Sequence, residues 1–283
     1  MNNFSRGIAF IFSLLFSLMM SVSAQAEVLL LVHGYAADAS SWEQSGVSEQ
    51  LATRGWKRAG LFNARPAGME FLPGPGIGAD RRAYVANLPA QAPLTIQSSQ
   101  LRSMLDGLRQ QFPDERLILV GHSAGGVVSR LALTNDNVFN VDTLITIASP
   151  HLGTVRAEQG MDLIDTKPFF CPGPGIDFLK SVLGGSRYRY VRNSRDLLVD
   201  LLPVESGNVL SWLNQQPHPD IAYYSVIRRS ANGVGDDIVP AYSQDLNNVP
   251  ALRGKARVIL ASTGHSLNAR DGALIADILD NRY

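Results

Sequence analysis

The sequence predicts an α/β fold in which a mostly parallel sheet is flanked by helices. Five short apolar runs have the character of strands buried on both faces, and segments with helical spacing lie between them. This alternation is typical of a parallel sheet, because parallel neighbours need a crossover connection between them. The length of 283 residues, 45% of them hydrophobic and 18% charged, suits a chain with a sizeable core.

The expected strands and helices follow the chain in a regular order. We expect the five buried strands at residues 28–32, 116–121, 141–149, 221–227 and 256–262, with weaker candidates at 56–62 and 83–88. A helix is predicted over 95–112, and its apolar face consists of Leu101, Met104, Leu105, Leu108 and Phe112. The same spacing near the end of the sequence predicts a last helix with Leu267, Leu274, Ile275 and Ile278 on one face.

Two segments interrupt the alternation. Residues 63–93 are rich in glycine and proline, and they predict a long loop with at most one short strand. Residues 154–220 are too long for a simple crossover and contain the apolar stretches DLLVDLLP and VLSWLNQQP, so we expect a helical cap or lid over one end of the sheet. We therefore expect one domain at 27–283 with this cap inserted in it.

The first 26 residues have the anatomy of a secretory signal. Arg6 precedes an apolar stretch from Ile8 to Met20, and Ala24 and Ala26 form an A-x-A site. We expect cleavage after Ala26 and export to the periplasm or the medium; the alternative, an uncleaved anchor, is less favoured because the apolar stretch is short.

The charge balance argues against a nucleic-acid-binding protein, and the single cysteine excludes a fold stabilised by disulfides. Loss of Arg6 from 25 basic residues leaves 24 against 25 acidic ones, which gives no electrostatic footprint for nucleic acid. Cys171 has no second cysteine with which to pair, so no intrachain disulfide can stabilise the fold.

A serine between glycines is the strongest sign of chemistry. Gly121-His122-Ser123-Ala124-Gly125 follows an expected strand and fits the G-x-S-x-G pattern of a nucleophile at a sharp strand-to-helix turn. Glycines remove side chains that would collide in such a turn and leave the hydroxyl accessible. The helix that follows directs its amino terminus at the same place. The alternative is an ordinary turn, but the apolar strand before Ser123 and the helical GGVVSRLAL after it favour the nucleophile.

A base and an acid complete the set that a serine nucleophile needs. His265 follows the last strand, so it lies at the same end of the sheet as Ser123 and is the expected base. The acid is Asp236 or Asp237 in GVGDDIVP, after the fourth buried strand; Asp245 is further from that strand. Four histidines have positions that fit the role less well: His33, His122, His151 and His218.

Two backbone N–H groups are expected to stabilise an oxyanion. In VHGY the first strand ends in His33-Gly34, and glycine lets the chain bend so that the N–H of Tyr35 points into the site. The second donor is the N–H of Ala124, directly after the nucleophile.

Four motifs in this order resemble the secreted bacterial lipases and esterases of the α/β-hydrolase superfamily. VHGY resembles their oxyanion strand, GHSAGG their nucleophile elbow, LITIASPHLGT their T-P-H-x-G stretch, and DDIVP their acid loop. The resemblance implies an α/β-hydrolase fold and an acid four residues before Pro240, which is Asp236. Ser149 stands where the family often has threonine, and Asp237 where it often has glycine. Some relatives hold calcium near the histidine loop, but HSLNARD offers no convincing ligand set.

The expected function is an exported serine hydrolase that cleaves carboxylic esters, of acyl lipids in particular, through an acyl-enzyme. Ser123, His265 and Asp236 form the expected triad, and neither a metal nor an organic cofactor is needed. The expected partners are a small-molecule or lipid ester and, transiently, a lipid surface. Two alternatives stay open: an acyltransferase that uses the same triad, and a catalytically silent binding protein with this fold.

Overall fold

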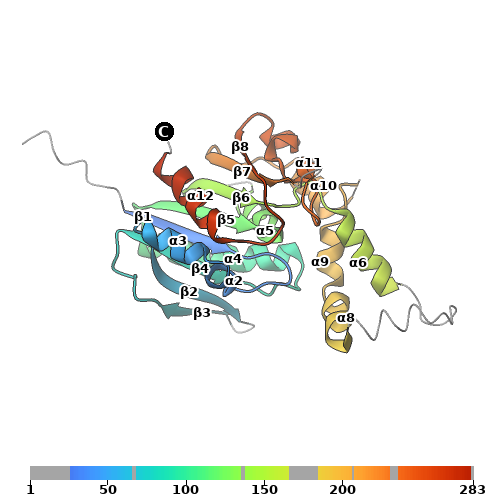
Figure 1. Cartoon of the computed structure of the whole chain (residues 1–283), viewed down its shortest axis with the longest axis horizontal. Coiled ribbons are helices and arrows are strands. Elements are labelled where there is room, and N and C mark those ends of the chain that lie inside the picture. Colours follow the sequence, from blue (N-terminus) through green and yellow to red (C-terminus); the bar gives the residue numbers. More distant parts are fainter. Residues whose placement is uncertain are drawn as a thin grey trace, which may run out of the picture.

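The computed structural model describes residues 26–65, 68–134, 138–165, 184–205, 207–229 and 235–281. Its centre is an eight-stranded sheet with the order β3-β2-β4-β1-β5-β6-β7-β8 (Figure 1). The bounds are β1 Glu27–Val32, β2 Lys57–Arg65, β3 Gly68–Pro73, β4 Arg81–Asn87, β5 Arg116–His122, β6 Val141–Ile147, β7 Ala222–Arg228 and β8 Ala256–Ala261. All neighbouring strands are parallel except β2 and β3, so the predicted mostly parallel sheet is confirmed.

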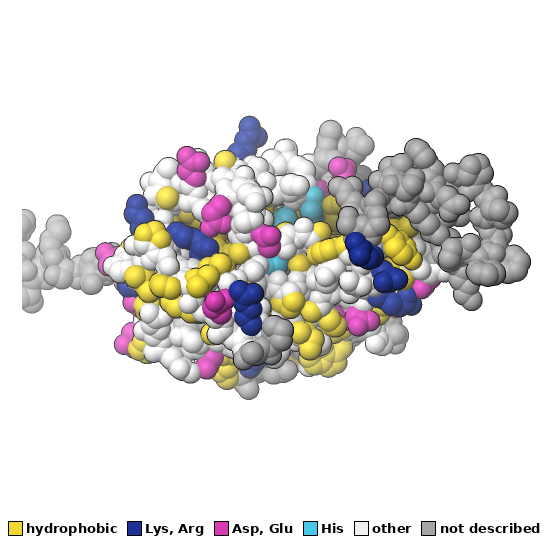
Figure 2. Space-filling view, turned by 90° about the horizontal axis from the view of Figure 1, so that it is seen from below, with side chains coloured by type: hydrophobic (Ala, Val, Ile, Leu, Met, Phe, Trp, Pro, Cys, Tyr) yellow, Lys and Arg dark blue, Asp and Glu magenta, His cyan; other side chains and the backbone are white. Residues whose placement is uncertain are grey.

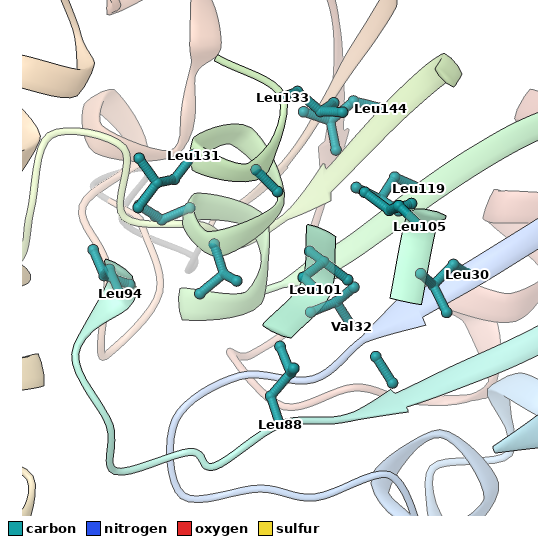
Figure 3. Close-up of a cluster of buried hydrophobic side chains, with 14 of the residues drawn as sticks. Leu30, Val32, Leu88, Leu94, Leu101, Leu105, Leu119, Leu131, Leu133 and Leu144 are labelled. Carbon is teal, nitrogen blue, oxygen red and sulfur yellow. The ribbon is translucent and has the colours of Figure 1, made fainter. Parts of the chain in front are cut away.

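Helices cover both faces of the sheet and create two separate cores. On one face α4 (Leu94–Gln111) and α5 (Ala124–Ala132) pack on Leu30 and Val32 of β1 (Figure 3), and on the other α3 (Val47–Thr53) and α12 (Ala269–Asp280) pack with Leu29 and Leu31. Successive residues of a strand point to opposite faces, so a strand between two cores must be apolar at every position. This is why β1 is an unbroken apolar run from Val28 to Val32.

The stretch from residue 63 to residue 93 contains more strand than the sequence predicts. The two weaker candidates are β2 and β4, and β3 forms an antiparallel pair with β2 inside the expected loop. The prediction of at most one short strand is therefore wrong. Because β3 is an edge strand whose side chains are mostly exposed, it needs no apolar pattern, and its flanking glycines and prolines hide it in the sequence.

Helices occupy the described part of the segment between β6 and β7. They are α6 (Val155–Asp165), α8 (Gly184–Asn193), α9 (Arg195–Asp200) and α10 (Val209–Leu213). Figure 1 shows α6, α8 and α9 standing beyond one end of the sheet. Leu197, Leu198, Leu210 and Leu213 are buried in the same core as α4 and α5, so these side chains are ordinary core. Whether the helices act as a lid stays a prediction.

Some expected features lie outside the described residues. These are the apolar part of the signal sequence and residues 166–183 of the expected cap, which include Cys171. Among the helices that the structure describes, none combines the length and the apolar character needed to cross a bilayer. Between β7 and β8 the structure describes three short helices, α11 (Ala241–Gln244), η1 (Leu246–Asn248) and η2 (Pro250–Leu252).

Candidate active site

Ser123 occupies a sharp turn between β5 and α5. Its backbone has φ 52° and ψ −129°, a conformation that residues other than glycine rarely adopt. A Cβ on Gly121 would lie 2.4 Å from the Cα of Gly126, and one on Gly125 would lie 2.3 Å from the carbonyl oxygen of His33. The glycines are therefore required by close packing around the turn. Ser123 itself is more buried than the sequence suggests, because its neighbours close over it.

The structure brings Ser123, His265 and Asp236 into one hydrogen-bonded chain. The Nε2 atom of His265 lies 3.0 Å from the Ser123 hydroxyl oxygen, and Nδ1 lies 2.9 Å from a carboxylate oxygen of Asp236. The imidazole is 17% exposed and the carboxylate 0%. With the hydrogen on Nδ1, His265 donates to Asp236 and accepts from Ser123. Parallel strands β5, β7 and β8 make this possible because their carboxyl ends lie along one edge of the sheet.

Asp236, and not Asp237, faces the histidine. Its Oδ1 accepts the N–H groups of Ile238 at 2.7 Å and Val239 at 2.6 Å, and the amide of Gln244 donates to Oδ2 at 3.2 Å. Burial opposes the charge of Asp236, but the hydrogen bond and charge of His265 and the two N–H groups outweigh it and hold the pKa of the carboxyl below its usual value. The side chain of Asp237 is exposed.

The loop after β1 lies against the nucleophile. A Cβ on Gly34 would lie 2.7 Å from the Cβ of Ser123, so only glycine permits this approach. Within the described chain, no acceptor takes the backbone N–H of Tyr35 or of Ala124. Ala124 is the first residue of α5, and its N–H is one of the donors that every helix leaves free at its amino terminus. The N–H of Ala124 thus lies directly after Ser123 and that of Tyr35 directly after the glycine that packs on Ser123, and both lack an acceptor among the described residues.

His33 fixes the peptide that carries the Tyr35 N–H. Its Nε2 accepts the backbone N–H of Leu88 at 3.1 Å, so Nδ1 carries the hydrogen and donates to the carbonyl oxygen of Gly34 at 2.9 Å. In a trans peptide the carbonyl and the next N–H point in opposite directions. The bond from His33 therefore turns the Tyr35 N–H away from His33. Burial lowers the pKa of His33, which keeps the ring neutral and this arrangement intact.

His122 supports the loop of His265, a role that its place in the sequence does not reveal. Its side chain lies against His265, since Nε2 is 2.8 Å from the backbone carbonyl oxygen of His265 and the ring centroids are 5.2 Å apart. Burial, together with the charge of His265, lowers the pKa of His122 to about 3. The neutral ring donates to the His265 backbone and holds it beside Ser123.

The remaining histidines and a buried arginine lie apart from Ser123. His151 is buried beside Thr146, with Nε2 3.2 Å from the threonine hydroxyl, and Arg130 is buried next to Asn214. Burial lowers the pKa of His151 well below its usual value and that of His218 to about 4. Sequence spacing gives no sign of this cluster, because its members come from distant segments.

Figure 2 shows one face of the molecule on which histidine side chains reach the surface, with patches of hydrophobic side chains nearby. In the described ranges, no three His, Cys, Asp or Glu side chains are grouped so that they could hold a metal ion. The site thus consists of a hydroxyl, an imidazole and a carboxylate in one hydrogen-bonded chain, with backbone N–H groups beside them.

Comparisons with known sequences give partial matches. Residues 90–164 match the family model of the PGAP1-like alpha/beta domain. GPI inositol-deacylase B of Yarrowia lipolytica is 51% identical over 53 residues, which are 18% of this chain and 5% of that protein. The chain thus spans only a small part of the length of this curated relative.

Solved structures resemble the chain over nearly its whole length. The mature lipase BlEst2 of Bacillus licheniformis has a TM-score of 0.60 and 17% identity, over 93% of this chain and 94% of that one. The product of gene lin2722 of Listeria innocua has a TM-score of 0.58 and 18% identity, over 91% of this chain and 94% of that one. These likenesses and the sheet topology confirm the predicted α/β-hydrolase fold.

Proposed function

We propose that this chain, an α/β-hydrolase by fold, is a serine hydrolase that cleaves carboxylic esters of acyl lipids. The observation that supports this most strongly is the hydrogen-bonded chain from Ser123 through His265 to Asp236. A serine hydroxyl is a weak nucleophile until a base removes its proton, and the base needs a partner that fixes its tautomer. Ser123 has the imidazole of His265 at hydrogen-bond distance, and His265 has the carboxylate of Asp236 at hydrogen-bond distance.

In the proposed acylation step, the Ser123 oxygen attacks the ester carbonyl carbon while Nε2 of His265 takes the hydroxyl proton. The buried carboxylate of Asp236 stabilises the imidazolium that forms. The tetrahedral intermediate then collapses: the bond to the alcohol oxygen breaks, and His265 gives its proton to that oxygen. An acyl-Ser123 ester remains.

The oxyanion of the intermediate is stabilised by the N–H groups of Tyr35 and Ala124. Both are free in the described chain, and the amino terminus of α5 adds a favourable dipole. Such donors lower the barrier because they are already oriented when the negative charge develops. The burial that surrounds Ser123 strengthens their effect.

Water completes the cycle. It attacks the acyl-enzyme while His265 takes one of its protons, and the carboxylic acid leaves as the proton returns to the Ser123 oxygen. No redox partner or metal enters this proposed scheme. The name of the Yarrowia relative, an inositol-deacylase, and that of the Bacillus lipase support an acyl group bound through oxygen as the target.

Export and contact with lipid belong to the same proposal. The signal-like residues 1–26 support a cleaved, exported protein, periplasmic or extracellular. The hydrophobic patches near the histidines in Figure 2 support a substrate with an apolar chain.

The experiment that tests the proposal is a panel of p-nitrophenyl esters from acetate to palmitate together with a triacylglycerol emulsion, run in parallel with fluorophosphonate labelling. Wild-type protein should hydrolyse the longer esters and take up one label, whereas Ser123→Ala should do neither and keep its melting temperature. A Ser123→Ala variant with wild-type rates would overturn the mechanism. Wild-type protein that is labelled but hydrolyses no ester would overturn the substrate class.

A further inference from the structure

A buried ion pair lies next to the proposed triad and takes no part in the chemistry derived above. Arg228 is the last residue of β7 and Asp271 lies in the first turn of α12. Their side chains are 1% and 2% exposed, and Nη2 of the arginine lies 2.6 Å from Oδ2 of the aspartate. A pair buried this deeply is costly to desolvate and is weak evidence for added stability, so its contacts must be considered for what they position.

The pair holds both ends of the loop that carries His265. On one side, Nη1 of Arg228 donates to the hydroxyl of Thr263, two residues before the histidine. On the other, Oδ2 of Asp271 accepts the backbone N–H of Asn268 at 2.9 Å, in a capping box at the start of α12. The loop is therefore attached to Arg228 two residues before His265 and, through Asp271, three residues after it.

The backbone of Arg228 also reaches the acid. Its N–H donates to Oε1 of Gln244 at 2.7 Å, and Nε2 of this buried glutamine donates to Oδ2 of Asp236 at 3.2 Å and to the carbonyl oxygen of Val239 at 2.8 Å. The oxygen that Gln244 contacts is the one that faces His265. One residue at the end of β7 thus connects to the acid loop through its backbone and to the histidine loop through its side chain.

We infer that Arg228 and Asp271 are positioning residues that set His265 against Asp236 and Ser123. The inference rests on the proposed function. Proton transfer between triad members needs hydrogen-bond distance, and a displacement of about 1 Å in an active site can cost about 100-fold in rate. The loop of His265 is otherwise exposed to solvent at several positions, so directional bonds to a buried pair are an effective way to keep its backbone in place.

The test removes both charges together. Arg228→Met with Asp271→Met leaves no unpaired buried charge, so the fold should survive. We expect kcat on p-nitrophenyl butyrate to fall about 10- to 100-fold with KM changed less than about two-fold, because the base is displaced while the binding surface is retained. The rate of fluorophosphonate labelling should fall by the same factor.

A second ion pair gives the matched control. Arg82 of β4 pairs with Glu115, their side chains are 12% and 21% exposed, and they lie at the amino ends of the strands, opposite Ser123. Arg82→Met with Glu115→Met should lower the melting temperature without changing kcat. If kcat of the Arg228 and Asp271 double variant stays within three-fold of wild type, the positioning role is refuted.

Two further outcomes have a definite meaning. If the double variant does not fold, Thr263→Val removes one loop contact and leaves the ion pair; it should lower kcat about three- to ten-fold, and an unchanged kcat would refute the positioning role. Wild-type protein that neither hydrolyses an ester nor reacts with the fluorophosphonate would overturn the proposed function and the positioning role with it. The behaviour of wild type therefore separates the two failures.

Discussion

Replacing Asp236 by asparagine should inactivate the site through the tautomer of His265. The side-chain position that accepts the N–H groups of Ile238 and Val239 must remain an oxygen, because an NH2 group there would face two donors. The asparagine NH2 therefore points at His265. Nδ1 must then accept, the hydrogen moves to Nε2, and that nitrogen can no longer take the proton of Ser123.

The magnitude follows from this forced orientation. A triad with its histidine in the wrong tautomer loses about 10³- to 10⁴-fold in kcat, which at about 1.4 kcal/mol per factor of ten is about 4 to 5.5 kcal/mol of transition-state stabilisation. The loss should be in kcat rather than KM, because the carboxylate does not contact the ester. Gln244 would also face the new NH2 group, so a small drop in melting temperature is expected as well.

Asp237→Asn is the matched control, since it makes the same chemical change one residue away on an exposed side chain. The assay compares the initial rates of both variants on p-nitrophenyl butyrate, with their melting temperatures measured in parallel. Asp237→Asn should stay within two-fold of wild type. An Asp236→Asn variant that keeps more than a tenth of the wild-type kcat, or a reversed ranking of the two, would refute the reasoning.

Two more predictions concern packing and pH. Gly34→Ala should lower kcat at least about 100-fold, because its Cβ would meet Ser123 at 2.7 Å, whereas Gly78→Ala, which meets nothing within 4 Å, should leave it unchanged; equal rates for both would contradict the close approach. Burial lowers the pKa of His122 to about 3 and that of His218 to about 4, so between about pH 4 and pH 6.5 the unfolded chain binds more protons than the folded one. Urea unfolding should show a free energy of unfolding that decreases as the pH is lowered through this range, by up to about 1.4 kcal/mol per pH unit for each histidine, and less steeply in His218→Gln; identical slopes would argue against a neutral buried His218.

The parts of the fold that the sequence predicts are those with a direct physical signature. A strand between two cores must be apolar where both faces are covered, as β1 is from Val28 to Val32 and β5 from Leu117 to Val120; an amphipathic helix must repeat every three or four residues, and α4 does. The edge strand β3 has neither signature, so it is missed. Its existence depends on pairing with β2, which no local pattern records.

The candidate site also contains parts that the sequence predicts and parts that it does not. Ser123 and His265 are brought together because the ends of parallel strands share one edge, which chain order alone can predict. Strand and loop spacing cannot choose between Asp236 and Asp237, because adjacent residues in a loop differ mainly in the direction of their side chains. Only the resemblance to known lipases and esterases points to Asp236. The contact of Arg228 with Asp271, 43 residues apart, is beyond sequence patterns altogether, since two surface-type residues meet in the interior.

The spacing of the triad along the chain has a consequence for biosynthesis. Ser123 and His265 are separated by 142 residues, and the loop of His265 is held between β8 and α12. A nascent polypeptide can complete β1, β5 and the serine turn early, but His265 cannot reach Ser123 until residues beyond 265 have been made and β8 has joined the sheet. If Ser123 and His265 act as proposed, a growing or still unfolded chain cannot attack the acyl lipids it meets on its way, and catalysis begins only after β8 has joined the sheet.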